Sequence, residues 1–241
     1  MTLRVDVITL FPEMFAPMDH SIMGRARKMG VLDFNTIQLR NFAINEYGQV
    51  DDKPFGGEPG MVLRPEPLAK AIDSTGVREG LGKVIHLCAD GVPLTHALAQ
   101  QLTQETHLVM VCGHYKGIDE RIRTSRVDLN ISIGDYVLSG GEIPAMVVID
   151  AIVRLIPGVL HDLDAALTDS HAQGTLGWPV YTRPEVFEET TVPPILLSGH
   201  HKRIGEWQRQ QSLVRTQERR PDLYEKVILS KEDHRILKTI Y

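Results

Sequence analysis

The sequence predicts an α/β fold built on a parallel sheet. Short apolar, β-branched segments recur between residues 4 and 133, most of them stop at a glycine or another turn residue, and helix-like patterns follow several of them. Strands that alternate with helices predict parallel pairing through right-handed crossovers. Parallel strands are buried on both faces, which explains why these segments are almost continuously apolar.

The expected elements can be placed in chain order. Pro144 suits the first turn of the most apolar helix, and Ser139 or Glu142 could satisfy free N–H groups near its start. That helix is apolar nearly all round, so we expect it to be buried. Strands are predicted at residues 4–10, 83–88, 107–112 and 129–133, and helices at residues 95–104, 118–124 and 145–156.

Composition limits the classes of function. The chain has 241 residues and a net charge of -5, so binding to nucleic acid would need a local basic patch. The N-terminus lacks a signal-peptide pattern, and no uncharged apolar run has membrane-spanning length. We therefore expect a cytoplasmic protein with no membrane partner. Cys88 and Cys112 lie in predicted strands, where buried, inert thiols are expected.

The sequence divides into three regions. Residues 1–158 carry the strand and helix pattern of the α/β domain. Residues 159–176 are polar and weakly periodic, and they follow Pro157-Gly158, which ends the apolar helix. We expect them to form a flexible connector that could act as a lid. Residues 177–241 are predicted to form a small, mostly helical domain.

Glycines end three of the predicted strands, at Gly91, Gly113 and Gly134. Ligands of open parallel sheets bind beyond the carboxyl ends of the strands, where glycine lets the backbone approach them. The alternative is that these glycines serve the turns alone. The nucleotide-binding patterns GxGxxG and GxxxxGK[ST] and the serine elbow GxSxG are missing, so a nucleoside-like ligand would have to bind in another way.

Charged residues elsewhere allow two interpretations each. Asp150 and Arg154 are four residues apart, so they either form an ion pair along a helix or leave Arg154 to hold an anion. Asp169 is either a turn former or a functional carboxylate. The surrounding histidines and aspartates match no metal-ligand spacing, so no metal site is predicted: His161, Asp162, Asp164, Asp169 and His171.

A basic segment lies near the C-terminus. It is either a solvated helical face or a nucleic-acid contact, to which Trp207 would add stacking capacity. Its cationic residues are Lys202, Arg203, Arg209, Arg215, Arg219 and Arg220.

Several motifs resemble one family in the same order along essentially the whole chain. They are GGEPGM, CGHYKGIDER, SIGDYVLSGGEIPAM, RLIPGVL, YTRPEV, VPPILLSGHH and RRPDL. The chain is similar to the bacterial tRNA (guanine-N1)-methyltransferases of the SPOUT superfamily. The resemblance implies a deep trefoil knot in the α/β domain and a homodimer with its active site between subunits. It also implies transfer of a methyl group from S-adenosylmethionine to N1 of the guanine at tRNA position 37, next to the anticodon.

The resemblance also implies roles for individual residues. Asp169 would be the catalytic base and Arg154 the cation near the guanosine. Magnesium is possible in this family, although nothing in the sequence indicates it. The residues expected to contact S-adenosylmethionine are Leu87, Gly91, Gly113, Tyr115, Gly117, Ile133, Gly134, Asp135, Tyr136, Val137, Leu138, Gly140, Gly141 and Pro144.

Two positions depart from the family pattern. His114 replaces the usual Arg and Lys116 the usual Glu, while Glu58 and Asp90 add carboxylates nearby. We hypothesise that Lys116 pairs with Glu58 or Asp90, which would replace the missing acid; the alternative is that Lys116 points to solvent. Other functions remain open: a non-catalytic or differently targeted RNA-binding SPOUT relative, or a small-molecule enzyme that binds an anion at Arg154.

Overall fold

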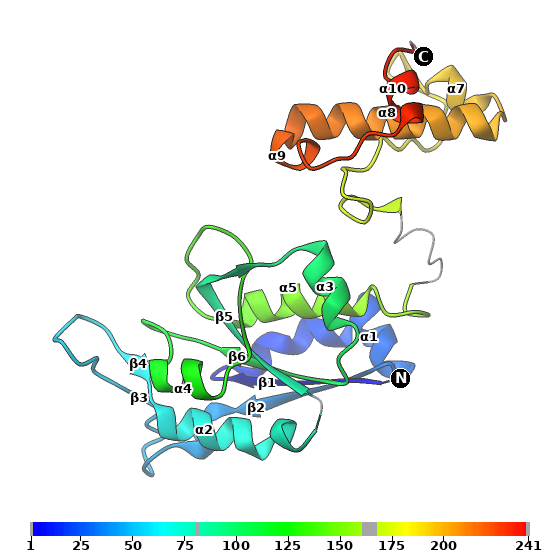
Figure 1. The fold of residues 1–241 in the computed structure, drawn as a ribbon. Coiled ribbons are helices and arrows are strands. Elements are labelled where there is room, and N and C mark those ends of the chain that lie inside the picture. Colours follow the sequence, from blue (N-terminus) through cyan, green and yellow to red (C-terminus); the bar gives the residue numbers. More distant parts are fainter. Residues whose placement is uncertain (1, 81, 161–167, 240–241) are drawn as a thin grey trace. The chain divides into compact units, whose positions relative to one another are not determined.

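A computed structural model describes residues 2–80, 82–160 and 168–239 (Figure 1). The chain forms two compact units, Met1–His161 and Asp162–Tyr241, and each is described here by itself. Residues 161–167, most of the first half of the predicted connector, lie outside the described residues. The domain boundaries expected at residues 158 and 177 therefore stay a prediction.

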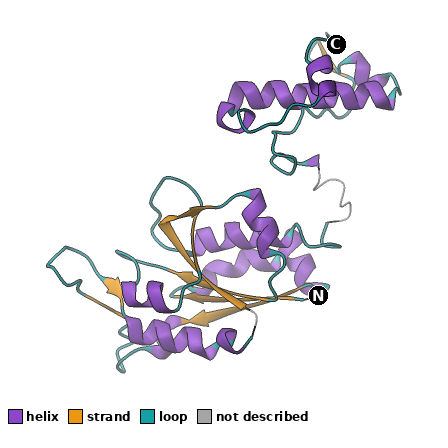
Figure 2. Ribbon diagram, viewed as in Figure 1, coloured by secondary structure: helices purple, strands orange, loops and turns teal. Residues whose placement is uncertain are grey.

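A five-stranded parallel sheet forms the centre of the first unit (Figure 2). Every neighbouring pair of strands is parallel, and the order is β2-β1-β6-β5-β7. The predicted α/β class is therefore confirmed, whereas the trefoil knot stays a prediction. The strands are β1 (Leu3–Thr9), β2 (Leu32–Gln38), β5 (Gly82–Pro93), β6 (His107–Cys112) and β7 (Leu129–Ser132).

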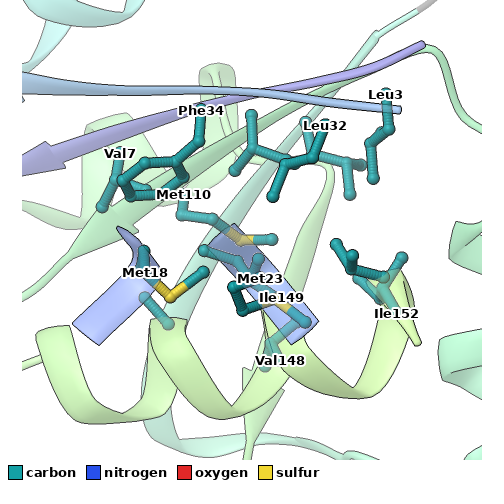
Figure 3. Packing of buried hydrophobic residues seen from close by; sticks show 14 of the residues in the cluster. Leu3, Val7, Met18, Met23, Leu32, Phe34, Met110, Val148, Ile149 and Ile152 are labelled. Atoms are coloured by element: carbon teal, nitrogen blue, oxygen red, sulfur yellow. The ribbon is translucent and has the colours of Figure 1, made fainter. Parts of the chain in front are cut away.

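Helices cover both faces of this sheet. Side chains alternate along β6, so Met110 packs into one core cluster while Val109 and Val111 pack into the other. The first cluster includes Phe34 and Ile149 and is shown in Figure 3. Helices η1 (Pro12–Asp19), α1 (Ser21–Lys28), α3 (His96–Leu102) and α5 (Glu142–Val153) contribute to the first cluster, and α2 (Pro65–Ser74) and α4 (Glu120–Ser125) to the second.

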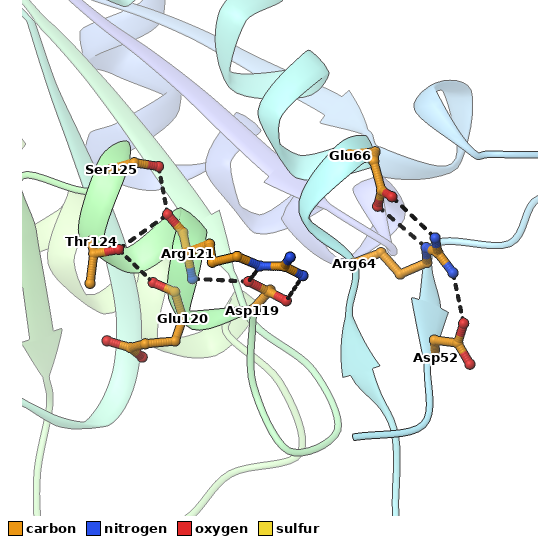
Figure 4. Close-up of polar contacts among 8 residues, drawn as sticks. All are labelled: Asp52, Arg64, Glu66, Asp119, Glu120, Arg121, Thr124 and Ser125. Atoms are coloured by element: carbon orange, nitrogen blue, oxygen red, sulfur yellow. Dashed lines mark hydrogen bonds and ion pairs between the residues drawn. The ribbon is translucent and has the colours of Figure 1, made fainter. Parts of the chain in front are cut away.

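Two short strands flank a glycine-rich loop at residues 53–61 of the first unit. Strands β3 (Asp51–Asp52) and β4 (Val62–Leu63) pair antiparallel at its base. Arg64 bonds to Asp52 and Glu66 there, and Arg121 bonds to Asp119, the N-cap of α4 (Figure 4). These ion pairs hold the ends of the loop and the start of α4. The remaining short helices are η2 (Leu39–Phe42) and η3 (Val77–Glu79).

Strand β5 is longer than the predicted segment 83–88. It continues to Pro93 through a bulge, because Leu87 and Val92 both align with Ile131 of β7. The sequence Ala89-Asp90-Gly91 therefore bulges out of the strand instead of ending it.

Helix α5 begins at Glu142, three residues earlier than predicted, and it is not buried all round. Ile143 and Val147 are 50% and 42% exposed and form one stripe with Asp150. We expected this helix to be fully buried, and within the first unit that expectation was wrong. An apolar sequence pattern cannot indicate which other part of the protein covers each face of a helix.

The second unit is built around the long helix α8 (His201–Arg219). Trp207 and Leu213 are buried against its neighbours. The described end of the predicted connector also belongs to this unit, because Leu176 N–H donates to Thr216 Oγ1 at 2.9 Å. The other elements are β8 (Val186–Phe187), β9 (Thr190–Thr191), α7 (Pro194–Leu197), α9 (Pro221–Tyr224) and α10 (Lys231–Ile236).

Candidate functional site

A cavity of about 320 Å³ lies at the bulge of β5 and at the carboxyl ends of β6 and β7. Parallel strands bring their carboxyl ends to one edge of the sheet, so the loops after these strands meet there. Twenty-three residues line it: His86, Leu87, Cys88, Ala89, Asp90, Gly113, His114, Tyr115, Lys116, Gly117, Ile118, Arg123, Ile131, Ser132, Ile133, Gly134, Tyr136, Val137, Leu138, Ser139, Gly140, Gly141 and Pro144.

Glycines let the backbone form one wall of this cavity. A Cβ atom on Gly141 would lie 2.5 Å from Cys112 Cα and 2.9 Å from Gly113 N. The Gly141 N–H donates to the Gly113 carbonyl at 2.9 Å, so the start of α5 is held against the end of β6. A Cβ on Gly140 would meet the ring of His114 at 2.3 Å. Neither position has room for a side chain.

The turn after β6 has an unusual backbone. Tyr115 has a φ of 59°, a left-handed conformation that few residues other than glycine adopt, and Gly117 follows with a φ of 119°. Backbone strain of this kind is concentrated at functional sites. The turn is tied to the glycine-rich loop, because Lys116 N–H donates to the Met61 carbonyl at 3.0 Å.

A buried carboxylate lies behind the cavity wall. Glu142 is 1% exposed and accepts hydrogen bonds from Thr9 Oγ1 at 2.6 Å and His114 Nε2 at 2.8 Å. Burial alone would raise the pKa of Glu142, but these hydrogen bonds outweigh burial and leave its pKa below the ordinary value. Glu142 therefore links β1, α5 and the turn after β6.

We expect this carboxylate to make stability depend on acid pH. Because the pKa of Glu142 is lowered on folding, its contribution is present above the ordinary value of 4.5 and is lost as the pH falls through the folded value. Glu142→Gln should lower the free energy of unfolding by about 1–2 kcal/mol at pH 7. Urea unfolding between pH 3 and 7 measures the difference, which should shrink toward pH 3.

Glu46→Gln is the matched control, since Glu46 is exposed. The free energy of unfolding of this variant should match that of wild type at every pH from 3 to 7. If the free energy of unfolding of Glu142→Gln differed from that of wild type by the same amount at every pH, the ionised Glu142 carboxylate would not have the stabilising role assigned to it.

Lys116 pairs with one of its two candidate partners. Its Nζ lies 3.7 Å from Glu58 Oε2, whereas Asp90 bonds to Arg123 at 2.8 Å. The hypothesis of a compensating acid is confirmed for Glu58, and the alternative partner Asp90 is wrong. The Lys116 and Glu58 side chains are 51% and 72% exposed, so solvent screens their attraction.

Glu58→Gln is accordingly expected to have a small effect. Affinity for S-adenosylhomocysteine should change by less than about threefold, because exposed ion pairs contribute little. Isothermal titration calorimetry at 50 and 500 mM salt checks this, with Glu46→Gln as control. A tenfold loss at low salt that disappears at high salt would show that the pair matters for the site.

The structure gathers most of the residues predicted to contact S-adenosylmethionine. All of them line the cavity except Gly91 and Asp135. Gly91 instead packs against β7, where its Cβ would lie 2.6 Å from backbone atoms of Asn130 and Ile131. Asp135 is exposed.

Sequence reasoning missed several lining residues. His86 is buried within β5 and Ser132 at the end of β7, and a polar residue inside an apolar strand was the signal that could have identified them. Cys88 also lines the cavity, and burial raises the pKa of its thiol to about 12. The pKa of Cys112 is raised by burial as well, so both thiols are protonated at neutral pH.

The two predicted catalytic residues lie in different units. Arg154 is the C-cap of α5 in the first unit. Asp169 lines a second cavity of about 200 Å³ in the second unit, together with Trp178 and Gln208. Each unit is described by itself, so the predicted cooperation of Asp169 and Arg154 stays a prediction.

The basic segment forms the helix α8, with exposed cations at both ends. Lys202, Arg203 and Arg219 are exposed, whereas Arg209 bonds to Asp233 at 2.8 Å. Trp207 is only 5% exposed, so its predicted stacking role was wrong. Helical periodicity alone could not place the indole ring inside the unit.

Metal-ligand clusters and membrane spans are not found in the part of the chain that the structure describes. No group of three or more His, Cys, Asp or Glu side chains there could hold a metal ion. His161, Asp162 and Asp164 lie outside the described residues. None of the described helices combines the length and the hydropathy that a membrane-spanning helix needs.

The parallel sheet and the cavity at its carboxyl edge define an α/β protein with a backbone-lined cavity where ligands of such sheets bind. The family model for tRNA (Guanine-1)-methyltransferase TrmD matches residues 3–226. The chain therefore belongs to this family.

Three relatives, each called a tRNA (guanine-N(1)-)-methyltransferase, show how similar the chain is to other members. The protein from Desulforamulus reducens is 50% identical over 238 residues, covering 98% of this chain and 94% of the relative. The one from Staphylococcus epidermidis is 49% identical over 238 residues, covering 98% and 97%. The one from Staphylococcus aureus is 50% identical over 237 residues, covering 98% and 96%.

Proposed function

We propose that the protein transfers the methyl group of S-adenosylmethionine to N1 of the guanine at position 37 of tRNA. The observation that carries this proposal is the glycine-built cavity at the carboxyl edge of the sheet, in a chain of the tRNA (Guanine-1)-methyltransferase family. Magnesium is not part of the proposal, because no observation supports a site for it.

The cavity suits the methyl donor. Its volume of about 320 Å³ is in the range of small-molecule pockets, about 300–1,000 Å³. Much of its wall is backbone at Gly113, Gly134, Gly140 and Gly141, which lets an adenine and a ribose approach the chain closely. S-adenosylmethionine would supply an activated methyl group there.

The target nitrogen determines what the side chains must do. Guanine N1 carries a proton at neutral pH, so its lone pair is available only after a base removes that proton. We assign the proton to the Asp169 carboxylate and assign to Arg154 the stabilisation of the negative charge that spreads to O6. The N1–carbon bond forms as the carbon–sulfur bond breaks, and the sulfur keeps the electron pair.

Two surfaces fit the remaining parts of the proposal. Exposed cations on α8, including Lys202, Arg203 and Arg219, suit the phosphates of tRNA. The exposed stripe of Ile143 and Val147 on α5 suits a second copy of the chain, because contiguous apolar surface marks interfaces. We therefore also propose a homodimer with its active site between subunits, acting on tRNA in the cytoplasm.

Methyl transfer to two tRNA transcripts tests the proposed function. One transcript carries guanine at position 37 and the matched control carries adenine there, and mass spectrometry maps the methylated nucleotide. We expect one methyl group on N1 of guanine 37 and none on the control. Binding of S-adenosylhomocysteine without methyl transfer would favour a non-catalytic relative. Methyl transfer to another nucleotide would favour a relative with a different target.

A further inference from the structure

The buried side chain of His86 borders the cavity and has no role in the methyl transfer proposed above. His86 lies in β5, is 2% exposed and borders the cavity. Its Nδ1 lies 3.1 Å from Oδ1 of Asn130, the residue aligned with it in β7. The Cys88 thiol also points to this oxygen, at 3.8 Å. An amide oxygen only accepts hydrogen bonds, so Nδ1 of His86 carries the ring proton.

The imidazole is uncharged at neutral pH. Burial lowers the pKa of His86 to about 4, a change that the hydrogen bond to Asn130 only partly opposes. With one proton on Nδ1, the ring presents the lone pair of Nε2 as an acceptor.

This nitrogen lies beside Gly113 in the wall of the cavity. His86 Nε2 lies 3.0 Å from the place where a Cβ on Gly113 would be, and Gly113 itself lines the cavity. Within the described residues, no hydrogen bond to Nε2 is found. Among the described residues, no fully buried side-chain nitrogen or oxygen lacks a partner, so this nitrogen borders the open cavity, where a ligand that donates a hydrogen bond can reach it.

The chemistry of S-adenosylmethionine limits which of its groups could donate a hydrogen bond to His86 Nε2. It offers an ammonium, an adenine amine and two ribose hydroxyls as hydrogen-bond donors. The ammonium is disfavoured, because Arg123 and Asp90 form an ion pair and act on His86 with opposite sign, which leaves no net negative charge there to hold a cation. The adenine edge carries a donor beside an acceptor, which suits the consecutive backbone groups of the loop from Ile133 to Leu138. A lone neutral acceptor suits a hydroxyl.

We propose that His86 Nε2 accepts a hydrogen bond from a ribose hydroxyl of the methyl donor and thereby makes the site specific for an intact ribose. This role rests on the proposed function, since it requires S-adenosylmethionine or its product in the cavity. Asn130 would act as a positioning residue that holds the imidazole in the accepting tautomer.

Calorimetry with S-adenosylhomocysteine and its 2′-deoxy and 3′-deoxy analogues tests the assignment. We expect the wild type to bind one analogue about three- to tenfold more weakly, the range of one neutral hydrogen bond. His86→Phe, which keeps the ring but loses the acceptor, should bind all three equally. His86→Gln, which keeps an acceptor, should restore part of the discrimination. Thermal melting shows whether each variant is folded.

The same experiment distinguishes a failure of the proposed function from a failure of the role of His86. If folded wild-type protein does not bind S-adenosylhomocysteine, the proposed function is overturned together with the role of His86. If it binds all three ligands equally, or if His86→Phe keeps the wild-type preference, the role of His86 is overturned and the proposed function stands.

Discussion

Asp169→Ala is expected to lower the single-turnover rate of methyl transfer by about 10²- to 10⁴-fold, the usual contribution of a general base. The proposal assigns removal of the guanine N1 proton to this carboxylate, and no transfer can follow while the proton stays. Affinity for S-adenosylhomocysteine should remain within about twofold, since Asp169 lies in the second unit, whereas the donor cavity is in the first. Rapid-quench kinetics and calorimetry measure the two quantities.

Two further variants sharpen this test. Asp169→Asn keeps the shape of the side chain and removes its basicity, so it should be as slow as Asp169→Ala. Asp33→Ala removes an exposed carboxylate of β2 and should keep the wild-type rate. An Asp169→Asn variant that melts like wild type and retains its rate would rule out Asp169 as the base.

Gly141→Ala is expected to have the largest effect on the cavity that we propose for the methyl donor. The added Cβ would lie 2.5 Å from Cys112 Cα and 2.9 Å from Gly113 N, and neither backbone atom can rotate away. Gly141 itself has φ -83° and ψ -4°, which alanine adopts readily, so the effect is purely steric. Overpacking of this kind costs about 1–3 kcal/mol of stability.

The same displacement should weaken donor binding. The start of α5 would move away from the end of β6, and the hydrogen bond from Gly141 N to the Gly113 carbonyl would lengthen. A distortion that costs the complex 1.4 kcal/mol lowers affinity about tenfold. Urea unfolding and calorimetry with S-adenosylhomocysteine check both effects.

Gly205→Ala is the matched control for Gly141→Ala. Gly205 lies within helix α8, and its Cβ would meet nothing within 4 Å. This variant should be as stable as wild type or more stable by up to about 1 kcal/mol, because alanine favours helix. If Gly141→Ala behaved like Gly205→Ala, the close backbone contact would not be essential to the cavity.

Part of the fold could be predicted because its signal is local. β6 was predicted at residues 107–112, as observed, because six consecutive residues combine apolar character with turn signals at both ends. β2 was missed, because Asp33 and Asn35 interrupt an edge strand that is buried only in places. Helix α2 was missed too, although Pro65 and Pro67 occupy its first turn, where proline is tolerated.

The residues of the candidate site likewise include some that local sequence signals predict and others that such signals do not. Gly113 and Gly134 were predicted from their places after apolar segments, because glycine at a strand end is recognised within a few residues, whereas Gly91, predicted in the same way, does not line the cavity. The resemblance, not spacing, pointed to Tyr115 and Leu138, which also line the cavity. The bulge at residues 88–91 was not predicted, because it depends on the continued pairing of β5 with β7.

The sequence by itself determined the α/β class, the glycines that follow β6 and β7 and the cations of α8, because backbone conformation and apolar periodicity are properties of short segments. Only the tertiary structure decided which distant residues meet. Glu142 bonds to Thr9 across 133 positions, and His86 faces Asn130 across 44. Burial and hydrogen bonding depend on the strand order β2-β1-β6-β5-β7, which results from packing the whole chain and is encoded in no single segment.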